Sequence, residues 1–217
     1  MSNQKQLCPH SDINILSRLK EYISFAEFKQ LIDRVLQIQR TRKLENIAVI
    51  SEFAQEGKTF FSTAFGIGYA NRTRSKTLIV DTTTFTHPDS LTLERTLELD
   101  DRKKEDSHIN HTLVVNVDAL KMIEFQPSEP EAEESKASQI IETYQSQYGL
   151  ILFDTCALSA KNKHNIDPLA VARQCQSSIL IISKQTADAG GLKRIKDRLE
   201  KEHVQLLGIV YNAGKYA

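Results

Sequence analysis

The chain has 217 residues, of which 40% are hydrophobic and 26% charged, and its 28 basic and 28 acidic side chains leave a formal net charge of zero. This is typical of one large globular domain with a sizeable core, and the charge balance disfavours general binding to nucleic acid or to an anionic membrane. No run reaches the length of a membrane span, and residues 1–12 lack the apolar stretch of a signal peptide. We therefore expect a cytoplasmic protein, with its three cysteines (Cys8, Cys156 and Cys175) as reduced thiols.

Residues 1–12 are interpreted as a polar tail, and residues 13–43 carry a helical pattern. In the second half of this stretch, apolar residues recur mostly at three- and four-residue steps, which predicts a helix with one apolar face. Its members are Phe25, Phe28, Leu31, Ile32, Val35, Leu36 and Ile38. Self-association and packing within the chain explain this face equally well. We divide the chain into an N-terminal tail and helical arm at 1–43 and a main domain at 44–217.

The main domain alternates short apolar runs with helical patterns. The runs are nearly continuous, which is typical of strands buried on both faces of a parallel sheet; they cover 47–50, 77–81, 112–117, 150–154, 178–183 and 206–212. The helical patterns cover about 58–72, 89–99, 134–147, 167–175 and 188–202. This alternation predicts an α/β fold with a doubly wound, mostly parallel sheet between two helical layers. The acidic segment 125–135 contains two prolines and is predicted to be a loop.

The segment "SEFAQEGKTFF" at 51–61 lies between the first predicted strand and the helix after it. A loop in this position can bind phosphate, because backbone N–H groups and the helix N-terminus point at the anion. Its end, Gly57-Lys58-Thr59, fits the Walker A pattern G-x-x-x-x-G-K-[ST], in which the lysine reaches the phosphates and the hydroxyl binds Mg²⁺. The first glycine of the pattern is Glu52 here, so a strand-to-helix turn without a ligand is the alternative.

Two aspartates support the phosphate-binding interpretation. Asp81 ends the predicted strand at 77–81, and Asp154 ends the one at 150–154. Ligands bind beyond the carboxyl ends of the strands in open parallel sheets, and carboxylates there can hold Mg²⁺ or orient a nucleophile. Either aspartate alone would more often be a turn or helix cap. Together with Lys58 and Thr59 on one rim, they predict a phosphate and metal site.

Two other features favour a plain structural role. His108 and His111 lie beside Asp106, but no pattern of further metal ligands surrounds them, so they are interpreted as solvated side chains. Cys156 follows Asp154 closely, yet no histidine is placed by the sequence to activate it. We interpret it as a buried thiol.

The stretch "ISEFAQEGKTFFSTAFGIGYANRTRSKTLIVDTTT" resembles the nucleotide-binding region of the bacterial tyrosine kinases of capsule and exopolysaccharide systems, which belong to the ParA/MinD-like P-loop ATPases. Members typically carry Ser-Glu-x-Pro-x-x-Gly-Lys-Ser, then strands that end in Asp-x-Asp-x-Arg, Asp-Thr-Pro-Pro and Gly-x-Val-x-Asn. Phe53 stands where the ParA/MinD branch has its signature lysine, which favours the tyrosine-kinase branch. The matching positions are Ser51, Glu52, Gly57, Lys58, Thr59, Asp81, Asp154, Thr155, Gly208, Val210 and Asn212.

The resemblance implies a P-loop NTPase fold with ATP and Mg²⁺ as cofactors. It implies that Lys58 and Asp81 are catalytic, with Asp81 as the base that activates the acceptor hydroxyl, and that Asn212 lies near the adenine. The nucleotide-binding set is Gln55, Glu56, Gly57, Lys58, Thr59, Phe60 and Asn212, and the Mg²⁺ ligands are Thr59, Asp81 and Asp154.

The departures from the family pattern are concentrated at this site. Ala54 and Gln55 replace the proline and glycine of the loop, and Thr83 and Phe85 replace the second aspartate and the arginine. The five residues after Asn212 span at most about 18 Å when extended, so tail phosphorylation across a subunit interface is not expected. Loss of a carboxylate near the metal weakens transition-state charge control more than ground-state binding. We expect a degenerate member that binds ATP with weak or no phosphotransfer.

The resemblance also implies partners. It predicts self-association, a membrane-embedded polysaccharide co-polymerase as a partner at the inner face of the membrane, and a role in polysaccharide biosynthesis or export. Two alternatives stay open: a ParA/MinD-type positioning ATPase, and a scaffold that kept the fold without the nucleotide. ATP hydrolysis and tyrosine phosphorylation are both left undecided by the sequence.

Overall fold

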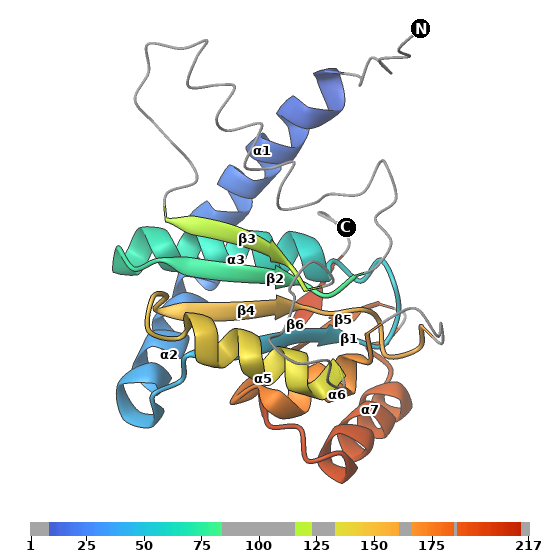
Figure 1. The fold of residues 1–217 in the computed structure, drawn as a ribbon. Helices are drawn as coiled ribbons and strands as arrows, with labels where there is room; N and C mark the ends of the chain where they lie inside the picture. Colours follow the sequence, from blue (N-terminus) through green and yellow to red (C-terminus); the bar gives the residue numbers. More distant parts are fainter. Residues whose placement is uncertain (1–8, 84–115, 123–132, 161–165, 185, 214–217) are drawn as a thin grey trace, which may run out of the picture.

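A single parallel sheet lies at the centre of the molecule (Figure 1). The computed structural model describes residues 9–83, 116–122, 133–160, 166–184 and 186–213. Within them the strand order is β3-β2-β4-β1-β5-β6, and every neighbouring pair is parallel. The strands are β1 Asn46–Ser51, β2 Thr77–Asp81, β3 Val117–Lys121, β4 Leu150–Asp154, β5 Ser177–Ser183 and β6 Leu206–Asn212. The predicted doubly wound α/β sheet is confirmed.

Helices cover both faces of this sheet. On one face lie α1 (Pro9–Ser24), α2 (Ala26–Arg42) and α3 (Lys58–Thr73), and on the other α5 (Glu133–Tyr144), α6 (Pro168–Gln174) and α7 (Ala189–Lys201). Successive residues of β1 alternate between the two layers: Ile47 and Val49 join the core under α3, and Ala48 and Ile50 join the core under α5 and α6. Because both faces of the central strands β1, β2, β4 and β5 are buried, each of these strands contains a continuous apolar run.

The apolar face predicted in the N-terminal arm packs inside the molecule. Phe28, Ile32 and Val35 of α2 are buried in the same core as α3. Gly68 of α3 permits the close approach, since a Cβ there would lie 2.6 Å from Ile32 Cδ1. All seven residues of the predicted face belong to this core or pack against it. Packing within the chain therefore explains the pattern, and the division between residues 43 and 44 stays a prediction.

Some predicted elements need correction. Most of the strand predicted at 112–117 lies outside the described residues, and the edge strand that they contain, β3, runs from Val117 to Lys121. β3 is an edge strand and largely half-exposed, so it lacks the continuous apolar run that marks the central strands. α1 begins at Pro9, inside the predicted tail, and α5 begins at Glu133, inside the predicted loop at 125–135. The helix predicted at 89–99, with Asp106, His108 and His111, lies outside the described residues.

The carboxyl ends of the strands form one rim of the sheet. Asp81 at the end of β2 and Asp154 at the end of β4 are paired Cα partners in the register. The loop after β1 enters α3 beside them. In the described part of the chain, no helix is both long enough and apolar enough to cross a membrane.

Candidate nucleotide-binding site

The loop after β1 has the backbone shape that its Gly-Lys-Thr end predicts. Gly57 has a φ of 92°, a left-handed conformation that favours glycine, and it directly precedes Lys58, the first residue of α3. A Cβ on Gly57 would lie 2.5 Å from Nδ2 of Asn212. That amide is fixed, because it donates a hydrogen bond to the backbone oxygen of Glu56 at 2.9 Å. Both backbone conformation and space therefore require glycine at this position.

Lys58 is folded into the loop. Its side chain is 8% exposed, and its Nζ donates to Oγ of Ser51 at 2.7 Å. Ser51 Oγ in turn donates to the carbonyl of Phe53, which closes the start of the loop. Burial lowers the pKa of Lys58, and the nearby charge of Asp154 partly opposes this. The structure thus places a cation inside the loop, at a cost in desolvation.

Asp154 is buried beside this cation. Its side chain is 3% exposed, and Oγ of Ser62 donates to Oδ1 at 3.3 Å. Burial raises the pKa of the Asp154 carboxyl to about 6, although Thr59, Lys58 and Ser62 act in the opposite direction. The charge of neighbouring Asp81 adds to the rise. The donors around Asp154 therefore do not compensate for its burial.

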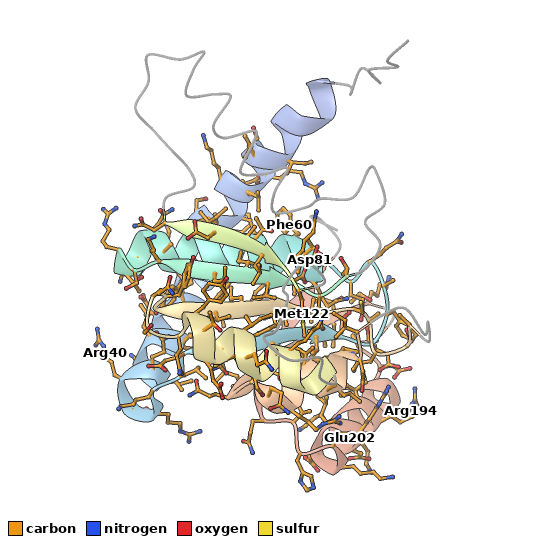
Figure 2. All side chains as sticks on the ribbon, in the orientation of Figure 1. Arg40, Phe60, Asp81, Met122, Arg194 and Glu202 are labelled. Carbon is orange, nitrogen blue, oxygen red and sulfur yellow. The ribbon has the colours of Figure 1, made fainter. Side chains whose placement is uncertain are left out.

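Asp81 lies at the end of β2 (Figure 2) and has two roles in the structure. Its Oδ1 accepts hydrogen bonds from the backbone N–H of Thr83 at 2.8 Å and from Oγ1 of Thr83 at 2.6 Å. It therefore caps a turn, which is the plain structural role considered for it from the sequence. It also adds negative charge next to Asp154. The carboxylate is half-buried, so it remains accessible from the rim.

The three predicted metal ligands are brought to one place. Thr59 and Asp81 both act on the carboxyl of Asp154, Thr59 through a hydrogen bond and Asp81 through its charge. No group of three or more His, Cys, Asp or Glu side chains suited to a metal occurs in the residues that the structure describes. Mg²⁺ commonly takes only one or two carboxylates and completes its octahedron with water and phosphate oxygens. The hydroxyl and two carboxylates fit an ion that arrives with a nucleotide.

The carboxylate of Glu56 is buried and bonded within the protein. Its side chain is 2% exposed, and its carboxylate accepts hydrogen bonds from the backbone N–H of Phe53 and from Ser183 and Thr186. Burial would raise the pKa of Glu56, but these donors together lower it below its usual value. Of its groups, only the backbone N–H remains a candidate for nucleotide contact.

The other predicted nucleotide-binding residues have mixed surroundings. Gln55 has a φ of 62°, so a non-glycine residue takes a left-handed conformation in the loop. Phe60, on the first turn of α3 (Figure 2), is half-buried and contacts α1, with its ring 5.3 Å from the ring of Tyr22 and 5.7 Å from the guanidinium of Arg18. Asn212 holds the loop backbone, as described above. These contacts show a packing role for Phe60 and Asn212, and their nucleotide contacts stay predictions.

Four side chains of the site were missed by the sequence analysis. Ser51 had been noted only as a match to the family pattern, and Ser62, Ser183 and Thr186 had not been singled out. Serine and threonine are common at helix starts and turns, so their presence carries little signal by itself. The one signal that was available for Ser62 is its position one helical turn after Lys58, which places both residues near the same strand ends.

Comparisons with known proteins identify structures with a similar fold. No protein-family profile and no curated protein sequence matches the chain. Among solved structures, the BceF tyrosine kinase domain is similar with a TM-score of 0.63 and 17% identity, covering 94% of this chain and 89% of that one. The VpsO kinase domain has a TM-score of 0.63 and 20% identity, covering 94% and 97%. The MinD cell division protein of Aquifex aeolicus has a TM-score of 0.52 and 17% identity, covering 79% and 70%.

These likenesses establish the fold. The chain has the P-loop α/β architecture shared by bacterial tyrosine kinase domains and MinD proteins, as its sequence resemblance implies.

Proposed function

We propose that the chain binds ATP together with Mg²⁺ at the loop formed by residues 51–59. The observation that carries this proposal is the burial of Lys58 and Asp154 side by side at the carboxyl rim of the sheet, next to a loop that enters α3 through the left-handed Gly57. Burial disfavours the charged form of both groups. Groups in this condition are common where a ligand supplies the missing partners.

Each charged group has a role in this proposal. The γ-phosphate would take Lys58 as its partner in place of Ser51, and the backbone N–H groups at the start of α3 would face the phosphates. Mg²⁺ would be held by Thr59 and Asp154, with Asp81 reached directly or through water. When bound, Mg²⁺ would neutralise charge on the phosphate oxygens.

Phosphotransfer is proposed to be weak or absent. Thr83 stands where the resembling kinases carry a second aspartate, and its hydroxyl and backbone N–H both bind Asp81. The candidate base is thus partly engaged in a turn. With one carboxylate fewer near the metal, the site stabilises a bound nucleotide better than a charged transition state.

The biological setting follows from the same resemblance. Three solved structures similar to this chain are kinase domains, including the kinase domain of the Escherichia coli tyrosine kinase ETK. Together with the sequence resemblance, this similarity supports our proposal of a role in the regulation of polysaccharide biosynthesis or export. The proposal includes a location at the inner face of the membrane, self-association and a membrane-embedded co-polymerase as partner. The apolar stripe of α2 no longer supports self-association, because it is covered by α3.

The test is binding of a fluorescent ATP analogue with and without Mg²⁺, in the wild type and in Lys58→Ala. We expect a micromolar dissociation constant, equivalent to about −8 kcal/mol, that is strengthened by Mg²⁺ and lost in the variant. Saturable Mg²⁺-dependent binding that is unchanged in Lys58→Ala would place the ligand elsewhere. Absence of binding at millimolar nucleotide would overturn the proposal and favour the scaffold alternative.

A ParA/MinD-type ATPase is the second candidate, favoured by the similarity to MinD structures. Phe53, which is 40% exposed, occupies the position of the signature lysine of that branch. Nucleotide-dependent dimerisation, measured by light scattering with and without ATP, distinguishes this candidate from the first.

A further inference from the structure

The loop at 51–59 contains a left-handed residue that is not glycine. Between Ser51 and Gly57 it contains no glycine, and yet Gln55 adopts a φ of 62°. A left-handed conformation is unfavourable for a residue with a Cβ, and such conformations persist only where the surroundings hold them. Something next to Gln55 must therefore fix the backbone.

The carboxylate of Glu56, the next residue, accepts hydrogen bonds from several groups of the protein. Its Oε2 accepts from the N–H of Phe53 at 2.9 Å, which closes the loop on itself. Its Oε1 accepts from the N–H of Ser183 at 3.0 Å, from Oγ of Ser183 at 2.8 Å and from Oγ1 of Thr186. Hydrogen bonds to an ionised acceptor are roughly twice as strong as neutral ones.

The hydrogen bonds of Glu56 connect the loop to the ends of β5 and β6. Ser183 ends β5, which pairs with β1 in the sheet, and Thr186 lies in the turn before α7. The backbone oxygen of Glu56 accepts from Asn212, at the end of β6. The residue after the left-handed Gln55 is thus held by three separate segments of the rim.

We propose that Glu56 is a positioning residue, whose inward carboxylate holds the glycine-poor loop in its phosphate-binding shape without touching the nucleotide. This inference rests on the proposed ATP binding and adds a cause for it. Glycine adopts a left-handed conformation without support, whereas Gln55 is held in it by the buried carboxylate of Glu56. Without that anion, only a fraction of molecules would have a competent loop, and the apparent affinity would fall by that fraction.

Glu56→Gln tests this idea without changing the volume of the side chain. One carboxylate oxygen becomes an NH₂ donor. In one orientation this donor faces the N–H of Phe53, and in the other it faces the N–H of Ser183, so a donor meets a donor in either case. We expect Mg²⁺-ATP analogue affinity to fall about tenfold or more.

Glu200→Gln, on the exposed surface of α7, is the matched control. It removes the same charge from a residue outside the proposed binding loop. We expect its affinity to stay within about twofold of the wild type, because an exposed charge is screened. An equal loss in both variants would overturn the proposal, because net charge alone would then explain the effect.

Rescue by glycine separates positioning from general stability. Gln55→Gly should restore most of the affinity lost in Glu56→Gln, because glycine takes the left-handed conformation without support. If Gln55→Gly restores nothing in that background, the proposed role is wrong. Should Glu56→Gln fail to fold, Thr186→Val and Ser183→Ala each remove one hydroxyl donor and are expected to lower affinity in smaller steps. Unchanged affinity in both would also overturn it.

Hydrogen exchange in the nucleotide-free protein keeps this inference distinct from the proposed function. The amide protons of Phe53 and Ser183 should exchange faster in Glu56→Gln and not in Glu200→Gln. If the wild type fails to bind ATP but the variants show this exchange pattern, the proposed ATP binding is wrong and the structural role of Glu56 in the loop is kept. Tight wild-type binding with no difference in exchange or affinity between the variants would refute the role of Glu56 alone.

Discussion

Two buried carboxylates on the same rim of the sheet have opposite surroundings. Glu56 accepts from two backbone N–H groups and two hydroxyls, and its pKa is lowered despite burial. Asp154 is also buried, with Ser62, Thr59 and the charge of Lys58 nearby, and its pKa is raised to about 6. Depth alone therefore does not decide the charge state, and the supply of donors does.

The number of hydrogen-bond donors distinguishes a carboxylate that stabilises the fold from one suited to bind a ligand. A carboxylate whose acceptor capacity is filled by the protein stabilises the fold and has no need of a ligand. A carboxylate left short of partners destabilises the fold until a cation or donor arrives. By this criterion Glu56 belongs to the architecture of the loop, and Asp154 is the group proposed to bind the ligand.

Replacement of Gly57 should have the largest effect on this arrangement. Gly57→Ala places a Cβ in a left-handed residue and against the Asn212 amide that holds Glu56. We expect a loss of about 2–4 kcal/mol in the free energy of unfolding and the loss of measurable ATP binding. Chemical denaturation and nucleotide titration check both.

Gly208→Ala is the control for that change, because a Cβ on Gly208 would meet no atom within 4 Å. It should leave binding unaltered. An equal loss of nucleotide binding in both variants would show that the loop does not specifically require glycine at position 57.

Asp154→Asn should stabilise the metal-free protein at neutral pH. The folded pKa of about 6 exceeds the ordinary value of 3.8, so the folded state binds more protons between these values. Stability of the wild type should therefore fall as the pH rises from about 4 to 6, by up to about 3 kcal/mol. The asparagine variant should lack this fall, and it should also lose the Mg²⁺ enhancement of nucleotide binding.

Denaturation at several pH values in the presence of a chelator measures the effect. Asp197→Asn, on exposed surface of α7, serves as the control and should keep the wild-type profile. Parallel pH profiles of stability for the wild type and Asp154→Asn would contradict the assignment of Asp154 as a buried carboxylate with too few hydrogen-bond donors.

The smallest effect is expected away from the rim. Arg72 of α3 pairs with Asp33 of α2 at 3.0 Å, with side chains 64% and 46% exposed. Solvent and salt screen such a pair, so Arg72→Ala should cost less than about 1 kcal/mol and leave nucleotide affinity unchanged. A larger loss in thermal unfolding would mean that the contact between α2 and α3 depends on charge as well as on its apolar core.

The sequence predicted the sheet well because its central strands are buried on both faces and contain continuous apolar runs. It did not predict β3 beyond Val117, where an edge position lets Asp118 and Lys121 enter the strand. Lys58, Asp81 and Asp154 were found because each has a fixed place relative to a strand end.

The role of Glu56 could not be found in the same way. Its partners Ser183 and Thr186 are 127 and 130 residues away in the chain, and neither belongs to a motif. Nor could the sequence show that Gln55 takes a left-handed conformation. Such contacts are set by which strands become neighbours in the sheet, and so they depend on the tertiary fold.

The most direct test of this account is a carboxyl-carbon NMR titration of Glu56 and Asp154, with and without Mg²⁺ and an ATP analogue. Without ligand, Asp154 should titrate near pH 6 and Glu56 below its ordinary value of 4.5. With ligand, the pKa of Asp154 should fall sharply, because a cation favours its ionised form, and that of Glu56 should stay where it was. A ligand-induced shift at Glu56, or none at Asp154, would contradict the division between a carboxylate that holds the loop and one that binds the ligand.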